Sequence, residues 1–258
     1  RFFSLPGREV SLKEAFLNIP MIQDYLWVPY VDGVYWSLSI EVTFYAWVFL
    51  AYITQQFKRI ELYLIMFMIV GALSHIYGMS ADYPRATKLL MLEYGYLFAA
   101  GICFFKIWQK KASVSTYVAL VVSFICIWIY LPVAYAGVVV SCYVVFAAMI
   151  FNRLKFLNAK PLIFLGTISY SLYLLHQNIG YVLLNLCYQY QIHPFLAIFI
   201  AFSLCAAAAT LVTFYIERPL IQRVRHSYEE RRESMICVIE KIEKIPSQIS
   251  SFAQRVIR

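Results

Sequence analysis

The sequence predicts an all-α fold, a polytopic membrane helix bundle with about seven transmembrane helices in these 258 residues. Composition is the first observation: 62% of the residues are hydrophobic and only 14% are charged. The mean hydropathy of +0.68 is the second, and it is far above that of a soluble domain. The third is that the apolar residues form runs of about the 20 residues needed to cross a bilayer.

Seven such runs can be placed along the chain. They lie near residues 36–54, 60–78, 88–105, 114–131, 133–151, 162–185 and 195–216. Basic residues follow every second run: Lys58, Arg59, Lys106, Lys110, Lys111, Arg153, Lys155, Lys160, Arg218, Arg223 and Arg225. Because Lys and Arg concentrate in cytoplasmic loops, these connections are predicted to lie inside, with residues 1–35 outside and the C-terminus in the cytoplasm.

This topology divides the chain into an exoplasmic segment (1–35), a transmembrane bundle (36–219) and a cytoplasmic tail (220–258). In the tail, Ile239, Ile242 and Ile245 follow helical spacing among charged residues. The pattern predicts an amphipathic helix on the membrane surface, broken near Pro246, so membrane lipid is an expected partner.

The net charge of +8 does not indicate nucleic acid, because the basic residues lie in short gaps rather than on one patch. The six cysteines show neither metal-ligand spacing nor an extracellular disulfide framework. No Gly-rich phosphate loop is present either. A zinc enzyme and a nucleotide-hydrolysing pump are therefore not expected, and no metal site is predicted.

Ionisable groups inside the apolar runs are informative, since each costs about 2.5–3.5 kcal/mol at the centre of a membrane helix. Glu41, Glu93 and His176 are such groups. Glu41 shares a helix face with Ser37 and Tyr45, which lie four residues before and after it. The sixth run places polar or small residues three or four apart as one stripe: Gly166, Ser169, Tyr173, His176 and Gly180.

Three stretches together resemble the hallmark segments of the membrane acyltransferase-3 family. They are YWSLSIEVTFY (Tyr35 to Tyr45), LGTISYSLYLLHQ (Leu165 to Gln177) and FYIERPL (Phe214 to Leu220). Val42 and Thr43 depart from the pattern, because the family commonly has a second acidic or polar pair there. Members O-acetylate surface polysaccharides, lipopolysaccharide or other exported sugars in bacteria.

The resemblance implies an O-acyltransferase of the plasma (bacterial inner) membrane. Acetyl-CoA, or a related acyl-CoA, would be the donor on the cytoplasmic side, and a carbohydrate or lipid-linked glycan the acceptor outside. Family members usually have about ten spans, and their first helix carries a histidine proposed as the catalytic base. This chain begins with Arg1 and its predicted topology starts outside, so we expect a fragment that lacks the N-terminal helices.

Glu41 and His176 are the predicted catalytic residues. The predicted substrate-binding residues are Trp36, Ser37, Ser39, Tyr45, Glu93, Ser169, Tyr170 and Tyr173. Glu41 could orient a catalytic imidazole, contact the acceptor or relay a proton, and His176 could act as a second base or an oxyanion donor. Counting residues from the predicted interfaces puts Glu41, Glu93 and His176 at similar depths, so Glu41 and His176 are expected to face one cavity.

Two other classes of function stay open from the sequence. A proton-coupled transporter or flippase of sugar-like substrates would also keep ionisable groups in the membrane. A receptor or scaffold without catalytic activity would need the polar residues only for packing between helices. The oligomeric state and the acceptor sugar are not predicted.

Overall fold

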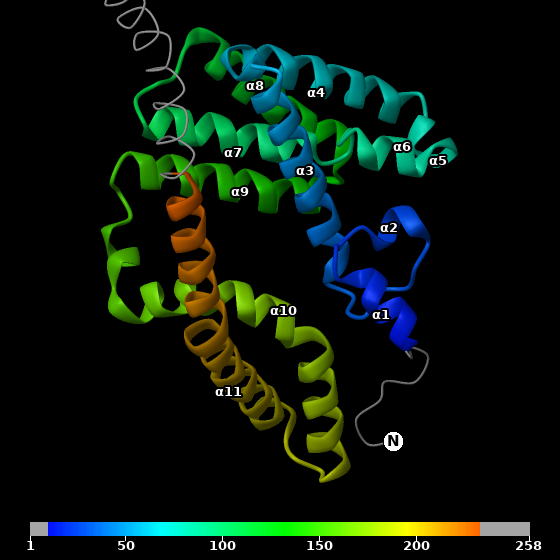
Figure 1. The fold of residues 1–258 in the computed structure, drawn as a ribbon, viewed down its shortest axis with the longest axis vertical. Coiled ribbons are helices and arrows are strands. Elements are labelled where there is room, and N and C mark those ends of the chain that lie inside the picture. The colour runs from blue at the N-terminus through cyan, green and yellow to red at the C-terminus, as the bar shows by residue number, and fades with distance from the viewer. Residues whose placement is uncertain (1–9, 233–258) are drawn as a thin grey trace, which may run out of the picture.

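The computed structural model describes residues 10–232, except for the side chains of residues 57, 58, 80 and 81. The predicted all-α bundle is confirmed, because this part of the chain forms helices and no strand (Figure 1). The helices are α1 (Leu12–Asn18), α2 (Gln23–Leu26), α3 (Tyr35–Ile53), α4 (Ile60–Ile76), α5 (Met79–Asp82), α6 (Pro84–Leu89), α7 (Gly95–Trp108), α8 (Val114–Tyr130), α9 (Val133–Ile150), α10 (Lys160–Gln189) and α11 (Pro194–Val212). Two short 3-10 helices, η1 (Gln56–Arg59) and η2 (Lys155–Asn158), and one π-helix, η3 (Thr213–Glu217), complete the described elements.

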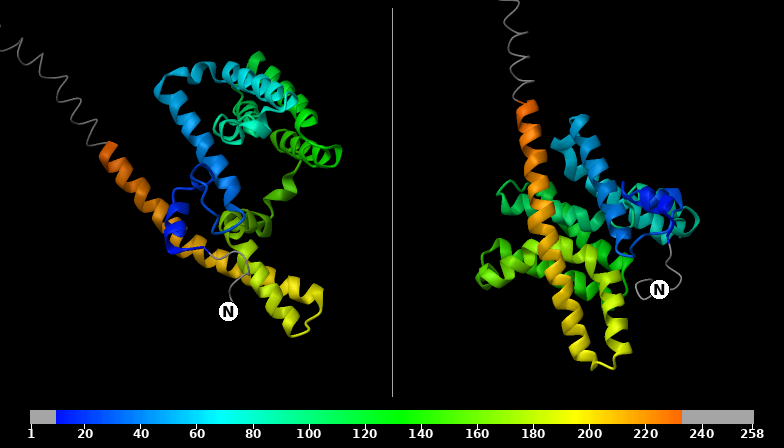
Figure 2. Two further views of the ribbon diagram at one scale, coloured as in Figure 1. Left: turned by 90° about the vertical axis from the view of Figure 1, so that its right-hand side faces the viewer. Right: turned by 60° about the horizontal axis from the view of Figure 1, so that its bottom comes forward.

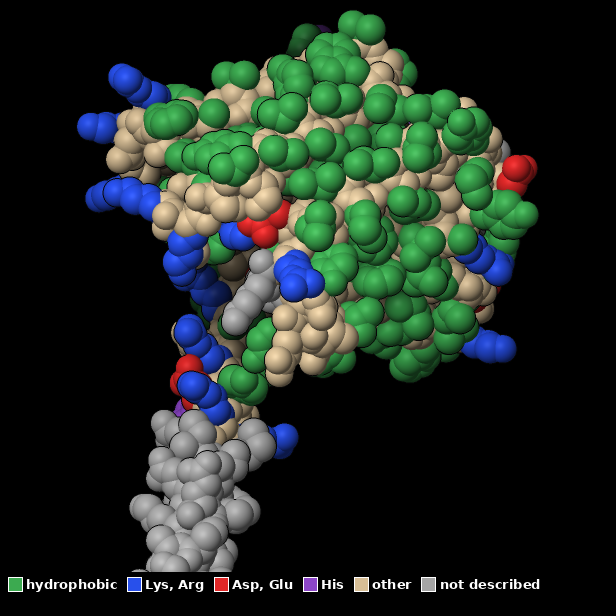
Figure 3. All heavy atoms as spheres, turned by 90° about the horizontal axis from the view of Figure 1, so that it is seen from above, with side chains coloured by type: hydrophobic (Ala, Val, Ile, Leu, Met, Phe, Trp, Pro, Cys, Tyr) green, Lys and Arg blue, Asp and Glu red, His purple; other side chains and the backbone are tan. Residues whose placement is uncertain are grey.

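Each of the seven predicted apolar runs overlaps a helix. Helices α3, α9 and the continuous helix Pro194–Arg232 are long and apolar enough to cross a membrane, whereas α4, α7 and α8 are shorter apolar helices. Helix α10 is 30 residues long and carries the polar stripe. Hydrophobic side chains cover much of the face in Figure 3, and Lys and Arg gather mainly along its left edge. Both features suit a protein that lies in a bilayer.

The third run begins later than its hydropathy predicts. Helix α7 starts at Gly95 rather than near residue 88, because residues 90–94 form a turn after α6. Met91 in this turn has a φ of 56°, a left-handed conformation that ends the preceding helix. Glu93 therefore lies in the turn and not inside a helix, which corrects its predicted place.

A tight core joins α4, α7, α8 and α9. Ala99, Cys103, Ala119 and Ala136 are completely buried in it, and such small residues let helices approach closely. At one end of these helices the carboxylate of Glu61, which is 4% exposed, accepts hydrogen bonds from Lys106 Nζ and, at 3.1 Å, from Thr116 Oγ1. These bonds connect α4, α7 and α8.

Helices α10 and α11 form a hairpin that crosses the direction of α4, α7 and α9, as Figures 1 and 2 show. Beyond α11 the helix continues through η3 to Arg232, so the chain has no break at residues 219–220, where the predicted tail begins. Ile239, Ile242, Ile245 and Pro246 of the predicted amphipathic helix lie outside the described residues.

Candidate functional site

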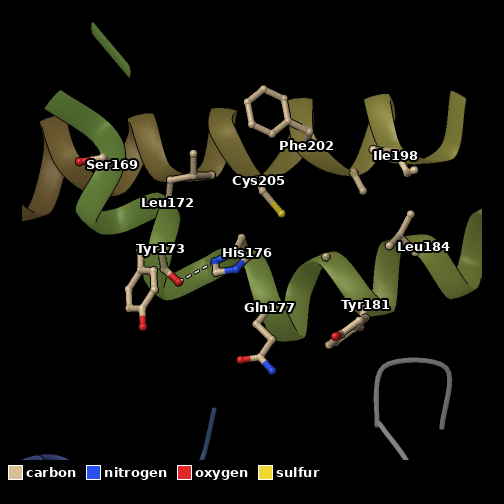
Figure 4. Close-up of a pocket in the computed structure, with 12 residues that line it drawn as sticks. Ser169, Leu172, Tyr173, His176, Gln177, Tyr181, Leu184, Ile198, Phe202 and Cys205 are labelled. Atoms are coloured by element: carbon tan, nitrogen blue, oxygen red, sulfur yellow. Dashed lines mark hydrogen bonds between the residues drawn. The ribbon is translucent and has the colours of Figure 1, made fainter. Parts of the chain in front are cut away.

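A groove of about 700 Å³ lies between α10 and α11, within the usual size range of ligand pockets. One wall carries four residues of the predicted stripe of α10, Ser169, Tyr173, His176 and Gly180, whereas Gly166 is not a groove residue. The α11 side is apolar, with Ile198 and Phe202 among others, as Figure 4 shows. Polar groups on one wall of an apolar groove favour binding of a ligand in a defined orientation.

His176 presents one free ring nitrogen in this groove. Its Nδ1 lies 2.8 Å from the backbone carbonyl oxygen of Tyr173 (Figure 4). Because a carbonyl oxygen only accepts hydrogen bonds, Nδ1 carries a proton, and in the neutral imidazole Nε2 is then the acceptor. This tautomer is the one that a general base requires.

His176 sits where α10 bends (Figure 4), and polar side chains hydrogen-bond to the backbone near this bend. The Asn178 N–H donates to Asp32 Oδ2 at 3.3 Å, while the Tyr173 carbonyl accepts from His176. Side-chain insertion into the backbone ladder is a common cause of helix bends. Asp32 is 6% exposed and also accepts the Val34 N–H at 3.1 Å, so its carboxylate is fixed.

The bend docks on residues 31–37, at the start of α3. Tyr173 Oη lies 2.6 Å from Ser37 Oγ, and the Asn178 side-chain amide donates to the Val31 carbonyl at 3.0 Å. A Cβ at Gly33 would lie 2.8 Å from Gln177 Nε2, so glycine leaves the room that this amide occupies. The first two hallmark segments therefore meet at Ser37 and Tyr173.

Glu41 lies outside the groove. Its Oε1 accepts the Tyr45 hydroxyl, one turn further along α3, and Tyr170 of α10 lies within electrostatic range of its carboxylate. Glu41 is not among the groove residues, so the expectation that it shares a cavity with His176 is not met there. The depth count assumed parallel helices, whereas α10 crosses the bundle (Figure 1).

The third hallmark segment brings a second carboxylate to α10. Glu217 Oε2 accepts the Ser171 hydroxyl at 2.9 Å, and Thr213 Oγ1 donates to Ser171 Oγ at 2.8 Å. Tyr170 also lies within electrostatic range of Glu217. Thr213 and Glu217 bound the π-helix η3, and π turns inside α-helices are frequent at functional sites.

The family follows from a comparison with known proteins. A family model described as Acyltransferase domain matches residues 3–218, which is most of the chain. This chain belongs to the membrane acyltransferase-3 family. Neither the curated proteins nor the solved structures include a match. Family membership supports acyltransferase activity in general, and together with the apolar helices it indicates a membrane protein.

Two of the other predicted site residues of this acyltransferase, Trp36 and Ser39, lie in different surroundings. Trp36 is 43% exposed, and its ring centroid lies 5.9 Å from that of Tyr94, the residue after Glu93. Burial, and then the negative charges of Glu93 and Asp24, raises the pKa of Tyr94, so its phenol stays protonated. Ser39 is completely buried inside the protein and is not a groove residue.

Sequence reasoning did not select Asp32, Asn178 or Glu217. Glu217 stood in a recognised hallmark segment, and that carboxylate could have been chosen. Asp32 and Asn178 gave no signal, because one precedes the first apolar run and the other follows the histidine without matching the stripe. Among residues 10–232, no three His, Cys, Asp or Glu side chains are grouped so that they could hold a metal ion.

Proposed function

We propose that this acyltransferase moves an acetyl group from acetyl-CoA in the cytoplasm to a hydroxyl of an exported or surface sugar. The acceptor is a carbohydrate or lipid-linked glycan on the outer side of the plasma (bacterial inner) membrane. The observation that carries the proposal is the His176 imidazole, which lies in a groove of about 700 Å³ with its Nδ1 hydrogen-bonded to the Tyr173 carbonyl.

The reaction requires a hydroxyl oxygen to attack the thioester carbon while it loses its proton. In the proposed mechanism Nε2 of His176 takes that proton, the C–S bond of the thioester breaks, and the CoA thiolate receives the proton as it leaves. Ser169 and Tyr173 lie on the same wall, and their hydroxyls donate to the carbonyls of Gly166 at 2.8 Å and of Val34 at 3.3 Å. In the proposed mechanism one of these hydroxyls exchanges its carbonyl partner for the oxyanion. The apolar residues of α11 limit the access of water.

Two carboxylates, those of Glu41 and Glu217, lie beside the groove and are not groove residues. Tyr170 lies within range of both carboxylates, and Ser37, one turn before Glu41, contacts Tyr173 of the groove. In this proposal Glu41, whose carboxylate accepts the Tyr45 hydroxyl, contacts the acceptor or relays the proton from beside the groove. Glu41→Gln, which keeps the shape and removes the charge, should lower transfer although the protein remains folded and inserted.

The proposal can be tested in membrane vesicles that contain the full-length protein. Label from acetyl-CoA should appear on a glycan, and His176→Ala should lower that transfer about 10²–10⁴-fold, the range for loss of a general base. His193→Ala is the matched control, because His193 is exposed in the α10–α11 loop and is not a groove residue. Sugar flux without acylated product would instead favour the transporter, and full activity of His176→Ala would contradict the proposal.

A further inference from the structure

A second cavity, of about 440 Å³, lies between α3, α4 and α7 and shares no residue with the groove. Its wall on α3 extends from Phe44 to Thr54. At about 1.5 Å per residue this is about 15 Å, or half of the roughly 30 Å hydrocarbon core. The cavity therefore extends along one leaflet of the bilayer.

The body of this cavity is apolar, with Leu64, Phe67 and Phe98 among its residues. The indole N–H of Trp47 donates to the Leu89 carbonyl at 2.7 Å, so that residue presents an apolar ring. The apolar side chains along this half-open cavity lose dispersion contacts unless a ligand packs against them. A hydrocarbon chain matches both the chemistry and the length.

The polar residues of the cavity gather at one end. Thr54 ends α3, Gln56 lies in η1, and Tyr63 is in the first turn of α4. The Tyr63 hydroxyl donates to Gln56 Oε1 at 2.9 Å, which leaves the Gln56 amide N–H groups as donors. This end suits the polar head of an amphiphile.

The same end is basic. Arg59 is exposed directly before α4, and the ion pair between Lys106 and Glu61 holds the last turn of α7 against the first turn of α4. Lys110 and Lys111 follow that last turn. By the loop charges this is the predicted cytoplasmic end, where basic pockets between membrane helices bind anionic head groups.

We propose that the cavity between α3, α4 and α7 holds one acyl chain of an anionic phospholipid of the cytoplasmic leaflet. The phosphate lies at Gln56 and Tyr63 of the cavity, near the exposed Arg59, and the chain extends along Trp47 towards Phe44. The site does not depend on the proposed acyl transfer, since its residues differ from those of the groove. A bound lipid of this kind would hold α3 against α4 and α7.

Native mass spectrometry of the full-length protein, purified in detergent and washed free of loose lipid, tests the proposal. The wild type should retain about one phosphatidylglycerol and prefer it to phosphatidylcholine. Ala51→Phe fills the cavity and should lower retention at least tenfold. Ala46→Phe makes the same change at an exposed position of α3 that is not a cavity residue, and it should retain lipid as the wild type does.

The head-group part has its own pair of variants. Arg59→Gln should lower the preference for phosphatidylglycerol about fivefold, the effect of about 1 kcal/mol per basic residue near the membrane surface. Arg153→Gln, an exposed basic residue after α9, should leave the preference unchanged. If Ala51→Phe does not fold, quenching of tryptophan fluorescence by brominated phosphatidylglycerol decides the question. The fluorescence of the wild type should be quenched more than that of the Trp47→Phe variant, which lacks the tryptophan of the cavity.

Several results would overturn the proposal. Equal retention by Ala51→Phe and Ala46→Phe would place the lipid elsewhere. Retention of palmitoyl-CoA in place of phospholipid would make the cavity a donor site, and the absence of any retained lipid would show that the cavity holds no lipid tightly. Quenching of wild type and Trp47→Phe to the same extent would exclude the chain from this cavity.

Discussion

The buried carboxylate of Glu61 allows a quantitative prediction about the stability of the bundle. Lys106→Met removes its charged partner and leaves the Thr116 hydroxyl, 3.1 Å away. Breaking a buried pair by removing one member costs about 3–5 kcal/mol, because a charge then stays buried without compensation. The Lys106 side chain is 28% exposed, which allows some solvation, so we expect a value of about 3 kcal/mol.

The free energy of unfolding can be measured in lipid bilayers by steric trapping. Glu61→Leu combined with Lys106→Met should recover most of the loss, because no unpaired charge remains and Thr116 keeps Ser113 as a partner. Arg225→Met is the control: its pair with Glu229 is 78% and 59% exposed and should contribute less than about 1 kcal/mol. This reasoning would be refuted if the unfolding free energy of Lys106→Met lay within about 1 kcal/mol of that of the wild type. It would also be refuted if the double variant were as unstable as the single variant.

Three further predictions concern the hairpin and the topology. Asp32→Asn removes charged acceptors from the Val34 and Asn178 N–H groups and should cost about 1.5–3 kcal/mol of unfolding free energy; a loss below about 0.5 kcal/mol would show that Asp32 does not fix the bend. Glu217→Gln keeps an oxygen for Ser171 and should unfold like the wild type, whereas Glu217→Leu should cost about 1–3 kcal/mol, and equal stabilities would contradict the hydrogen bond. A thiol reagent that cannot cross membranes should label Tyr190→Cys in intact cells but Gln109→Cys only after permeabilisation, and the reverse pattern would invert the topology.

The sequence predicted most of the helices because hydropathy reports burial in lipid directly. It failed at residues 90–94, where an apolar turn continues the hydrophobic run and only the backbone of Met91 reveals the break. It also could not predict the angle of α10. At the bend the Asn178 N–H donates to Asp32, which is distant in sequence, and spacing within α10 does not reveal this contact.

The candidate site was predictable to a similar extent. Helical spacing placed Gly166, Ser169, Tyr173, His176 and Gly180 on one face, and the groove contains all of them except Gly166. The spacing of Glu41 and Tyr45 likewise anticipated their hydrogen bond. What spacing within a helix cannot give is the partner across the interface, so the contacts of Tyr173 with Ser37 and of Ser171 with Glu217 required the structure.

Chemical rescue tests the central claim, that His176 is the base of an acyltransferase, most directly. Acyl transfer is measured for His176→Gly with and without added imidazole, and for His193→Gly as the control. Because His176 is exposed and lines the groove, its removal leaves room there for a free imidazole molecule. We predict that His176→Gly loses transfer about 10²–10⁴-fold, that imidazole restores it at least tenfold, and that His193→Gly is unaffected. Full activity of His176→Gly, or a loss that imidazole leaves unchanged, would contradict the account.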